Sequence, residues 1–229
     1  MAGNVAARST SSTVQDYLKT LLRIEESQDR VSTSNVARTL AVADSTVTDM
    51  LRKLHRAGLL EYRPYYGATL TEKGRKAALG ILRRHRLIEL FLHDVLGYGW
   101  EEVHEEAEKL EHTVSDFFIE RVDALLKHPA RDPHGEVIPD REGGREPEEG
   151  ICLGGAAEGR YQIVRVTNGE PGFFAYLERA GLRPGTRLTL VKREPYGGPL
   201  KLKVEGRKGL VYLGVEAVAN IFVKPQKPA

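Results

Sequence analysis

Apolar residues recur every three or four positions near the start of the chain, which is the spacing of an amphipathic helix. The first run places Val14, Leu18 and Leu21 on one face after a Ser/Ser/Thr cap, and it predicts a helix that ends near residue 27. A short helix over 34–40 is expected next, opened by further Ser and Thr residues.

A third helix is expected over 45–57, after the tight turn AVAD. Asp44 or Ser45 is its expected cap, and Gly58 suits the position just past its end. Short helix, tight turn and helix therefore follow one another within the first sixty residues.

The pattern then changes to strand, turn and strand, over 59–63 and 68–71 around the turn PYYG. Two longer helical patterns follow, one to about residue 95 and one over 101–127, separated by glycines. Both carry an apolar stripe, so we expect the two helices to pair.

Residues 128–150 are rich in Pro, Gly and charge and lack an apolar period, which predicts a linker. Short β-type runs beyond it, with one helix near 173–180, predict a small barrel. The fold class is therefore α+β. The predicted domains are a helix–turn–helix with its hairpin wing (1–74), a helical domain (75–140), a linker (141–157) and a β-barrel (158–229).

Charge is segregated along the chain, although the formal net charge is only +2. Residues 52–86 hold ten Lys or Arg against two Glu, as expected of a surface that binds a polyanion. Residues 87–126 hold eleven Asp or Glu against two basic residues, and this block favours cations. Two solvated helix faces are the alternative explanation of these blocks.

The single cysteine, Cys152, excludes an internal disulfide and a Cys-rich zinc finger. The sequence has no run of ~18 apolar residues and no apolar leader. We therefore expect a cytoplasmic protein without a membrane span.

Helix, turn, helix and hairpin in this order allow one helix to enter the major groove of DNA while the hairpin touches the backbone. Arg52 and Lys53 suit phosphates, and the Ser and Thr residues suit base edges. Asp49 would accept from a cytosine amino group or pair with Arg52 or Lys53. A winged helix used for protein contacts is the alternative. The candidate DNA-binding residues are Ser45, Thr46, Thr48, Asp49, Arg52 and Lys53 on the third helix, with Arg63 and Tyr65 on the wing.

The segment HEEAEKLEH carries His104, Glu108, Glu111 and His112 along one stripe of a predicted helix, where they converge on one or two ions. On the preceding helix, one turn apart, stand a further His and Glu, at 85 and 89. Imidazole and carboxylate donors without a thiolate favour Mn²⁺ or Fe²⁺. A solvated Glu-rich face is the alternative.

Together these residues resemble the iron- and manganese-dependent repressors typified by the diphtheria toxin repressor. The resemblance covers nearly the whole chain. It rests on the trailing barrel and on six motifs: DYLKTLLRIEE, VARTLAVADSTVTDMLRKLHRAGLL, LTEKGRKAA, RRHRLIELFL, VHEEAEKLEHTVSD and DPHGEVIP. It implies a winged helix-turn-helix, a helical metal-binding and dimerisation domain and an SH3-like (FeoA-type) barrel. It also implies a homodimer that binds palindromic operator DNA when Mn²⁺ or Fe²⁺ is bound, with neither an organic cofactor nor a membrane partner.

The resemblance implies one metal site of Asp16, Glu108, Glu111 and His112 and a second of His85, Glu89 and His104. Asp16 and Glu108 resemble the manganese-responsive branch, since the iron-responsive branch has Met and Cys there. Two positions depart from the family: Lys19 stands where the manganese branch often has Glu, and Phe173 where the iron branch has an amide. Glu170 matches an acid that ligates metal in the iron branch.

Two other functions are weighed against a metal-activated repressor. A metalloenzyme would use the same cluster with an open water position, but the sequence shows no general acid or base beyond the ligands. A metal-buffering or interaction protein would have no DNA affinity. We expect no enzymatic activity, and we expect Zn²⁺, Co²⁺, Cd²⁺ or Ni²⁺ to bind in vitro as well.

Overall fold

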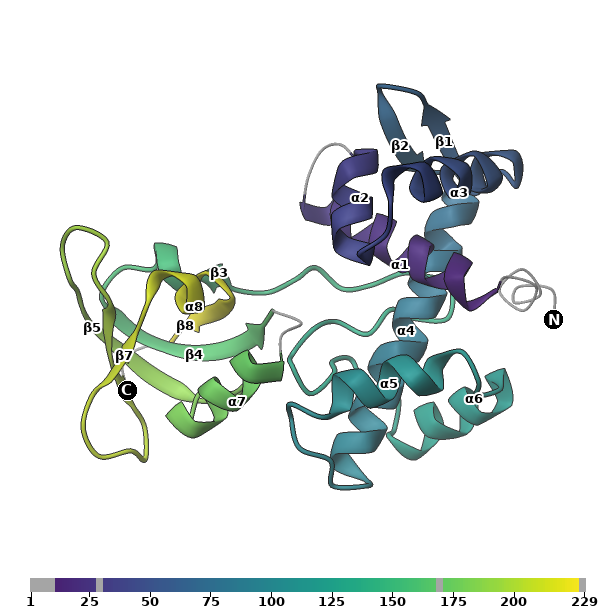
Figure 1. The fold of residues 1–229 in the computed structure, drawn as a ribbon. Helices are drawn as coiled ribbons and strands as arrows, with labels where there is room; N and C mark the ends of the chain where they lie inside the picture. The colour runs from purple at the N-terminus through teal and green to yellow at the C-terminus, as the bar shows by residue number, and fades with distance from the viewer. Residues whose placement is uncertain (1–10, 28–30, 168–170, 227–229) are drawn as a thin grey trace. The chain divides into compact units, whose positions relative to one another are not determined.

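A computed structural model describes residues 11–27, 31–167 and 171–226 (Figure 1). It divides into two compact units. The N-terminal unit comprises Met1–His85 with Pro139–Arg145, and the C-terminal unit comprises Arg86–Ile138 with Glu146–Ala229.

The N-terminal unit begins with three helices, and each ends within one residue of its predicted end. Ser32 caps the second helix by accepting a hydrogen bond from the backbone N–H of Asn35 at 3.1 Å, and Ala41 ends it in the left-handed conformation. The predicted cap of the third helix is wrong: Ala43 holds the cap position without a side-chain bond, and the carboxylate of Asp44 accepts from Ser34 instead. The three helices are α1 (Ser12–Ser27), α2 (Thr33–Leu40) and α3 (Asp44–Arg56).

The predicted wing is present as a two-stranded antiparallel hairpin, β1 (Leu60–Arg63) and β2 (Gly67–Leu70). Figure 1 shows it beside α3. Glu25 of α1 anchors its base, because that carboxylate accepts from the backbone N–H of Leu70 at 2.6 Å and pairs with Arg75. The wing therefore leaves the core at a set angle.

Helix α4 (Glu72–Asp94) runs from the N-terminal unit into the C-terminal unit. The predicted single helix over 101–127 is wrong, because the chain forms α5 (Val103–Glu111) and α6 (Asp116–Leu125) instead. Ser115 starts α6 as an N-cap, accepting from the backbone N–H of Phe118 at 3.1 Å. The break follows from this cap, since a Ser side chain that binds the backbone favours a helix start.

Part of the predicted linker is packed into the C-terminal unit. Asp132, Val137 and Ile138 are 5% exposed or less, although the segment contains neither helix nor strand. Arg86 of α4 donates to the carbonyl oxygen of Val137 and forms ion pairs with Asp132 and with Glu136. The composition of this segment predicted a linker because composition does not show that a buried Arg side chain from another element binds the loop.

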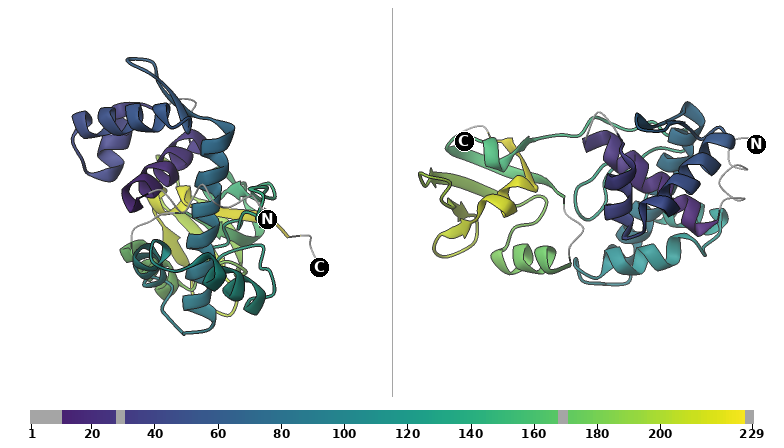
Figure 2. Two further views of the ribbon diagram at one scale, coloured as in Figure 1. Left: turned by 90° about the vertical axis from the view of Figure 1, so that its right-hand side faces the viewer. Right: turned by 45° about the horizontal axis from the view of Figure 1, so that its top comes forward.

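The C-terminal sheet is antiparallel throughout, with the strand order β3-β8-β4-β5-β6-β7. Figure 2 shows helix α7 alongside it. The β-type runs and this helix were predicted, whereas the short β3 and α8 were not. The elements are β3 (Ile151–Cys152), η1 (Leu153–Gly155), β4 (Gly159–Val166), α7 (Pro171–Ala180), β5 (Arg187–Arg193), β6 (Leu200–Val204), β7 (Val211–Leu213), α8 (Val215–Ala219) and β8 (Ile221–Pro225).

Among the helices of the described residues, none has the length and apolar character needed to cross a membrane.

Gly74, near the start of α4, lies against the backbone of Leu59 at the start of the wing. A Cβ added there would lie 1.8 Å from the carbonyl oxygen of Leu59, while one added at Gly80 on the same helix meets nothing within 4 Å. We expect Gly74→Ala to lower the free energy of unfolding by about 1–3 kcal/mol, because backbone must shift to admit the methyl group.

Gly80→Ala is the matched control, expected to raise the free energy of unfolding by about 0.5–1 kcal/mol through helix propensity. Urea unfolding of both variants measures the difference. Equal stabilisation by the two alanines would show that α4 does not approach Leu59 closely.

Candidate metal centre and nucleic-acid interface

The outward face of α3 carries the residues predicted to contact DNA. Its inner stripe of Val47, Leu51 and Leu54 is 1% exposed or less, and the remaining positions are therefore turned outward. Thr48 is half-buried, with its hydroxyl donating to the carbonyl oxygen of Asp44 at 2.9 Å. The exposed residues of the predicted face are Ser45, Thr46, Asp49, Arg52 and Lys53.

Asp49 pairs with Arg52, one of the two neighbours proposed for it, at 3.5 Å between Oδ1 and a guanidinium nitrogen. Both side chains are well exposed, so this pair contributes little to stability and can open. Arg52 is therefore available to an incoming phosphate.

The wing presents aromatic side chains at its turn. Tyr65 is 99% exposed and has a φ of 67°, and the neighbouring Tyr66 is 74% exposed. Arg63, on β1, is also exposed. Tyr66 was not among the predicted contacts, although its position beside Tyr65 in the turn PYYG was visible in the sequence.

The histidine-rich set consists of His85, Glu89 and His104. His85 and Glu89 lie one turn apart on α4 and are only 4% and 2% exposed. His104 of α5 places Nδ1 3.0 Å from Oε1 of Glu89. Each of the three residues offers a ligand atom, and these atoms lie within 4.8 Å of one another.

The glutamate-rich set consists of Glu108, Glu111 and His112, at the C-terminal end of α5. Their ligand atoms also lie within 4.8 Å of one another, and Nε2 of His112 is 3.3 Å from Oε1 of Glu111. The side chain of Glu111 is fully buried, while that of Glu108 is 38% exposed. Water therefore reaches Glu108 but not Glu111.

The two sets are neighbours along α5, because Nε2 of His104 lies 3.8 Å from Oε1 of Glu108 one turn later. The single stripe expected from helix spacing is thus divided, with His104 turned toward Glu89 and the other three residues grouped together, as the family resemblance implied. Two separate ion positions fit this arrangement better than one.

The chemistry of the donors suits a hard or borderline dication. Carboxylate oxygens and imidazole nitrogens make up both sets, as Mn²⁺ and Fe²⁺ prefer. A buried carboxylate is costly unless its charge is compensated, and Glu89 and Glu111 are both nearly inaccessible to water. Cys152 is in the C-terminal sheet, where Sγ donates to the carbonyl oxygen of Val218 at 3.5 Å.

The other two predicted ligands come from other segments of the chain. Asp16 is half-buried on α1 of the N-terminal unit. Glu170 lies outside the described residues. Phe173, at the position where an amide would be needed, packs against the apolar core of the sheet.

Sequence reasoning missed His134, which is 4% exposed and whose Nε2 lies 4.0 Å from Oε1 of Glu89. The residue falls in the stretch predicted as a linker. Its only signal was the motif DPHGEVIP, which the resemblance already included.

Three family models match the chain. Residues 9–68 match the N-terminal DNA-binding domain of the iron-dependent repressors, and residues 71–140 match their metal-binding and dimerisation domain. Residues 154–225 match the FeoA domain.

The chain is also similar to individual repressors over most of its length. The iron-dependent repressor IdeR of Mycobacterium tuberculosis is 33% identical over 199 residues, which cover 81% of this chain and 86% of that protein. A manganese-dependent transcriptional repressor solved with manganese is 38% identical, with a TM-score of 0.86 and coverage of 93% and 100%. The repressor ScaR with bound Cd²⁺ is 35% identical, with a TM-score of 0.80 and coverage of 93% and 99%.

Glu111→Gln removes a buried charge from the glutamate-rich set while nearly preserving the volume of the side chain. In a chelator, we expect a melting temperature equal to or above that of the wild type, because an amide costs less to bury than a carboxylate. With Mn²⁺ added, we expect a smaller rise than the wild type shows, because stabilisation by a ligand follows its affinity.

Glu105→Gln is the matched control, since Glu105 is an exposed residue of the same helix. It should retain the full rise with Mn²⁺ in the same thermal unfolding experiment. A full rise in Glu111→Gln as well would remove Glu111 from the metal ligands.

Proposed function

The chain belongs to the family of iron- and manganese-dependent transcriptional repressors, and from this premise we propose that it is a manganese-responsive repressor that reads a palindromic operator as a homodimer. The predicted family is confirmed. The observation that carries the proposal is the pairing of two His/Glu sets on α4 and α5 with an outward-facing reading helix.

We propose Mn²⁺ as the principal ion because every donor in the two sets is an oxygen or an imidazole nitrogen. Asp16 is proposed as a further ligand of the glutamate-rich set beside Glu108, because the family resemblance implies a ligand at this position. An oxygen donor at each of these two positions favours Mn²⁺ over softer ions. Cd²⁺, which is bound in the similar repressor ScaR, and Zn²⁺, Co²⁺ or Ni²⁺ are proposed to bind in vitro.

The bound ion would supply the positive charge that offsets the carboxylates of Glu89, Glu108 and Glu111. The ligand side chains of α5 would then hold a fixed position. Asp16, as a further ligand, would attach the start of α1 to the same ion. Because α1 packs in the same core as α3, ordering α1 would also set the position of the reading helix. The two reading helices of a dimer would thereby match successive major grooves.

On the DNA, Arg52 and Lys53 are proposed to bind phosphates, and Ser45, Thr46 and Thr48 to face base edges. Asp49 would accept from a cytosine amino group once Arg52 turns to the backbone. Arg63 and Tyr65 would touch the adjacent backbone from the wing. Since its target is chromosomal, we place the protein in the cytoplasm.

A metal-buffering protein is the second candidate, favoured by the same two sets but not by the exposed basic face of α3. A gel shift separates the two candidates, in which the protein is titrated into DNA from the region upstream of its own gene, with Mn²⁺ and with a chelator. Binding that needs Mn²⁺ supports the repressor, whereas no shift under either condition supports buffering. The enzymatic alternative fails because the family consists of transcriptional repressors.

His112→Ala removes a ligand from the glutamate-rich set. We expect Mn²⁺-dependent operator binding to fall at least tenfold, because ligand loss weakens the site that orders α1. Fluorescence anisotropy with labelled operator measures the change over a range of Mn²⁺ concentrations. His93→Ala on α4, outside both sets, is the control and should bind as the wild type does. Retention of the metal response in His112→Ala would contradict the assignment.

Arg52→Ala is expected to weaken binding to operator and to unrelated duplex alike, because a phosphate contact carries no sequence information. The slope of log affinity against log salt should fall by about one for each lost contact. Arg183→Ala is the matched control, since Arg183 is equally exposed and also pairs with an acid, Glu178, but lies in the C-terminal domain. A loss confined to operator DNA would instead mean that Arg52 reads a base.

A further inference from the structure

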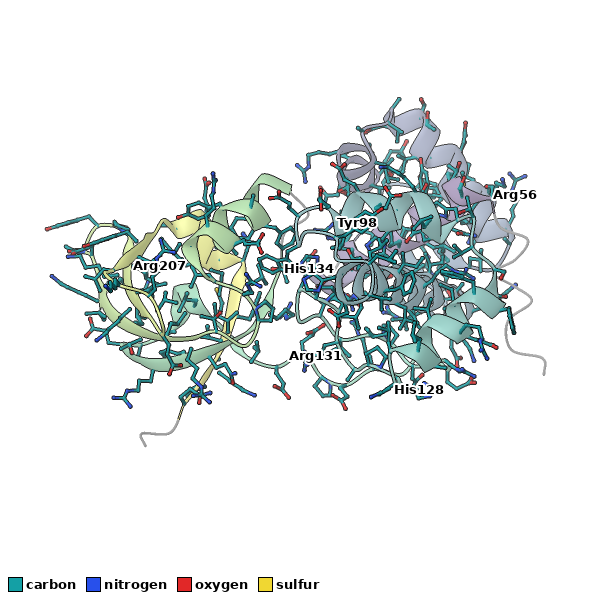
Figure 3. The ribbon with its side chains drawn as sticks, turned by 90° about the horizontal axis from the view of Figure 1, so that it is seen from below. Arg56, Tyr98, His128, Arg131, His134 and Arg207 are labelled. Atoms are coloured by element: carbon teal, nitrogen blue, oxygen red, sulfur yellow. The ribbon has the colours of Figure 1, made fainter. Side chains whose placement is uncertain are left out.

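The wing is held along both of its edges by side chains of two different helices. In an antiparallel hairpin, alternate backbone groups of each strand face away from the partner strand. On β1, Nδ1 of His55 lies 3.1 Å from the carbonyl oxygen of Leu60 and 3.4 Å from the backbone nitrogen of Tyr62. His55 belongs to α3, which ends at the exposed Arg56 on the outside of the unit (Figure 3). The edge of β1 is therefore attached to the reading helix.

The outer edge of β2 faces α1 instead. Ala68 and Leu70 alternate along β2 with residues whose N–H groups face β1, so their own N–H groups point away from it. Ala68 donates to the carbonyl oxygen of Val31 at 3.1 Å, and Leu70 donates to Oε1 of Glu25 at 2.6 Å. At the base of the wing, a carboxylate of α1 thus takes the place of a neighbouring strand.

The second oxygen of the Glu25 carboxylate is also occupied. Oε2 pairs with the guanidinium group of Arg75, near the start of α4. The side chain of Glu25 is only 11% exposed, whereas that of Arg75 is 45% exposed. A carboxylate so far removed from water is costly unless donors replace the water, and here each oxygen has one. Glu25 therefore joins α1, the wing and α4 at one point.

The predicted DNA contacts of the wing lie at its far end. Leu70 pairs with Leu60 at the base, and Gly67 pairs with Arg63 beside the turn. Three residues of strand place Arg63 about 10 Å from the anchored base. A tilt of about 10° at the base would move this end by about 2 Å, which is enough to break a hydrogen bond to a phosphate. The angle of the wing therefore decides whether its contacts form.

We propose that Glu25 is a positioning residue for DNA binding: its carboxylate, held by Arg75, fixes the base of the wing at the angle at which Arg63 and Tyr65 reach the DNA backbone. This inference rests on the proposed repressor function. Glu25 itself touches no DNA and acts through the position of β2.

The sign of the effect separates this role from a direct effect of charge. Glu25 is negative, so a purely electrostatic action on DNA predicts that its removal strengthens binding to a polyanion. Positioning of the wing predicts the opposite, because the contacts at the far end are lost with the anchor.

Two substitutions and a control test the role. Glu25→Ala removes both contacts of the carboxylate. Glu25→Gln keeps an oxygen that can accept from Leu70 but loses the charge that pairs with Arg75. Glu26→Ala is the matched control, because Glu26 is the next residue of α1 and also pairs with an arginine, Arg145.

The experiment is fluorescence anisotropy of the full-length protein with labelled DNA from the region upstream of its own gene, at saturating Mn²⁺. Stoichiometric titration corrects each affinity for the fraction of active protein. We expect Glu25→Ala to bind about tenfold more weakly, as loss of one charged contact does. The slope of log affinity against log salt should fall by about one. Glu25→Gln should recover most of the affinity, and Glu26→Ala should bind as the wild type does.

A double-mutant comparison locates the effect in the wing. The wing variant carries Arg63→Ala together with Tyr65→Ala. Adding Glu25→Ala to the wing variant should weaken binding no further, because the contacts that Glu25 positions are already absent. Adding Glu25→Ala to Arg52→Ala on α3 should multiply the two separate losses, because the two residues act on different contacts.

The possible failures are distinguishable. If the wild type shows no Mn²⁺-dependent binding to this DNA, the proposed repressor function fails. If the wild type binds and Glu25→Ala binds equally well or more tightly, the positioning role is overturned while the repressor function stands. An undiminished loss from Glu25→Ala in the wing variant would also overturn the role, because Glu25 would then act elsewhere than on the wing. So would equal losses in Glu25→Gln and Glu25→Ala, because the oxygen that accepts from Leu70 would then have no effect.

Discussion

The structure depends on compensating negative charge that the fold has removed from water. Glu89 and Glu111 are each 2% exposed, and each has an imidazole beside it rather than open solvent. Carboxylates so placed cost free energy unless a cation shares them, and a dication held by neighbouring imidazoles is suited to that role. Because the carboxylates are costly to bury without a cation, an ion bound there would stabilise the arrangement of the helices that carry them.

This effect of the ion matters because the proposed DNA-reading face of α3 contains none of the predicted metal ligands. The reading helix α3 is fixed by its apolar stripe in a core that it shares with α1. Its exposed face is left to Ser, Thr, Arg and Lys side chains, which are proposed to bind DNA through hydrogen bonds and charge. A signal from the metal therefore has to arrive through the placement of helices, for which α1 is the proposed carrier.

Buried charge also shapes the loop that follows α6. Arg86 holds the segment 131–138 through its ion pairs with Asp132 and Glu136, and the folded loop brings His134 to Glu89. Polar groups that would be unremarkable in a linker are thus fixed by a single buried guanidinium. The family resemblance contained this motif, but only the fold gave its histidine a neighbour.

The sequence by itself determined the first three helices, the wing, the strands of the C-terminal domain except β3, and the two helical His/Glu pairs, because each depends on local periodicity or caps. It predicted one helix where Ser115 starts a second, and a linker where Arg86 buries a loop. Helix spacing alone left His104, Glu108, Glu111 and His112 as one stripe. The tertiary structure turns His104 to Glu89 while Glu111 groups with His112, which is the division that the family resemblance implied. Spacing places side chains on a helix face, but long-range packing decides which of them meet.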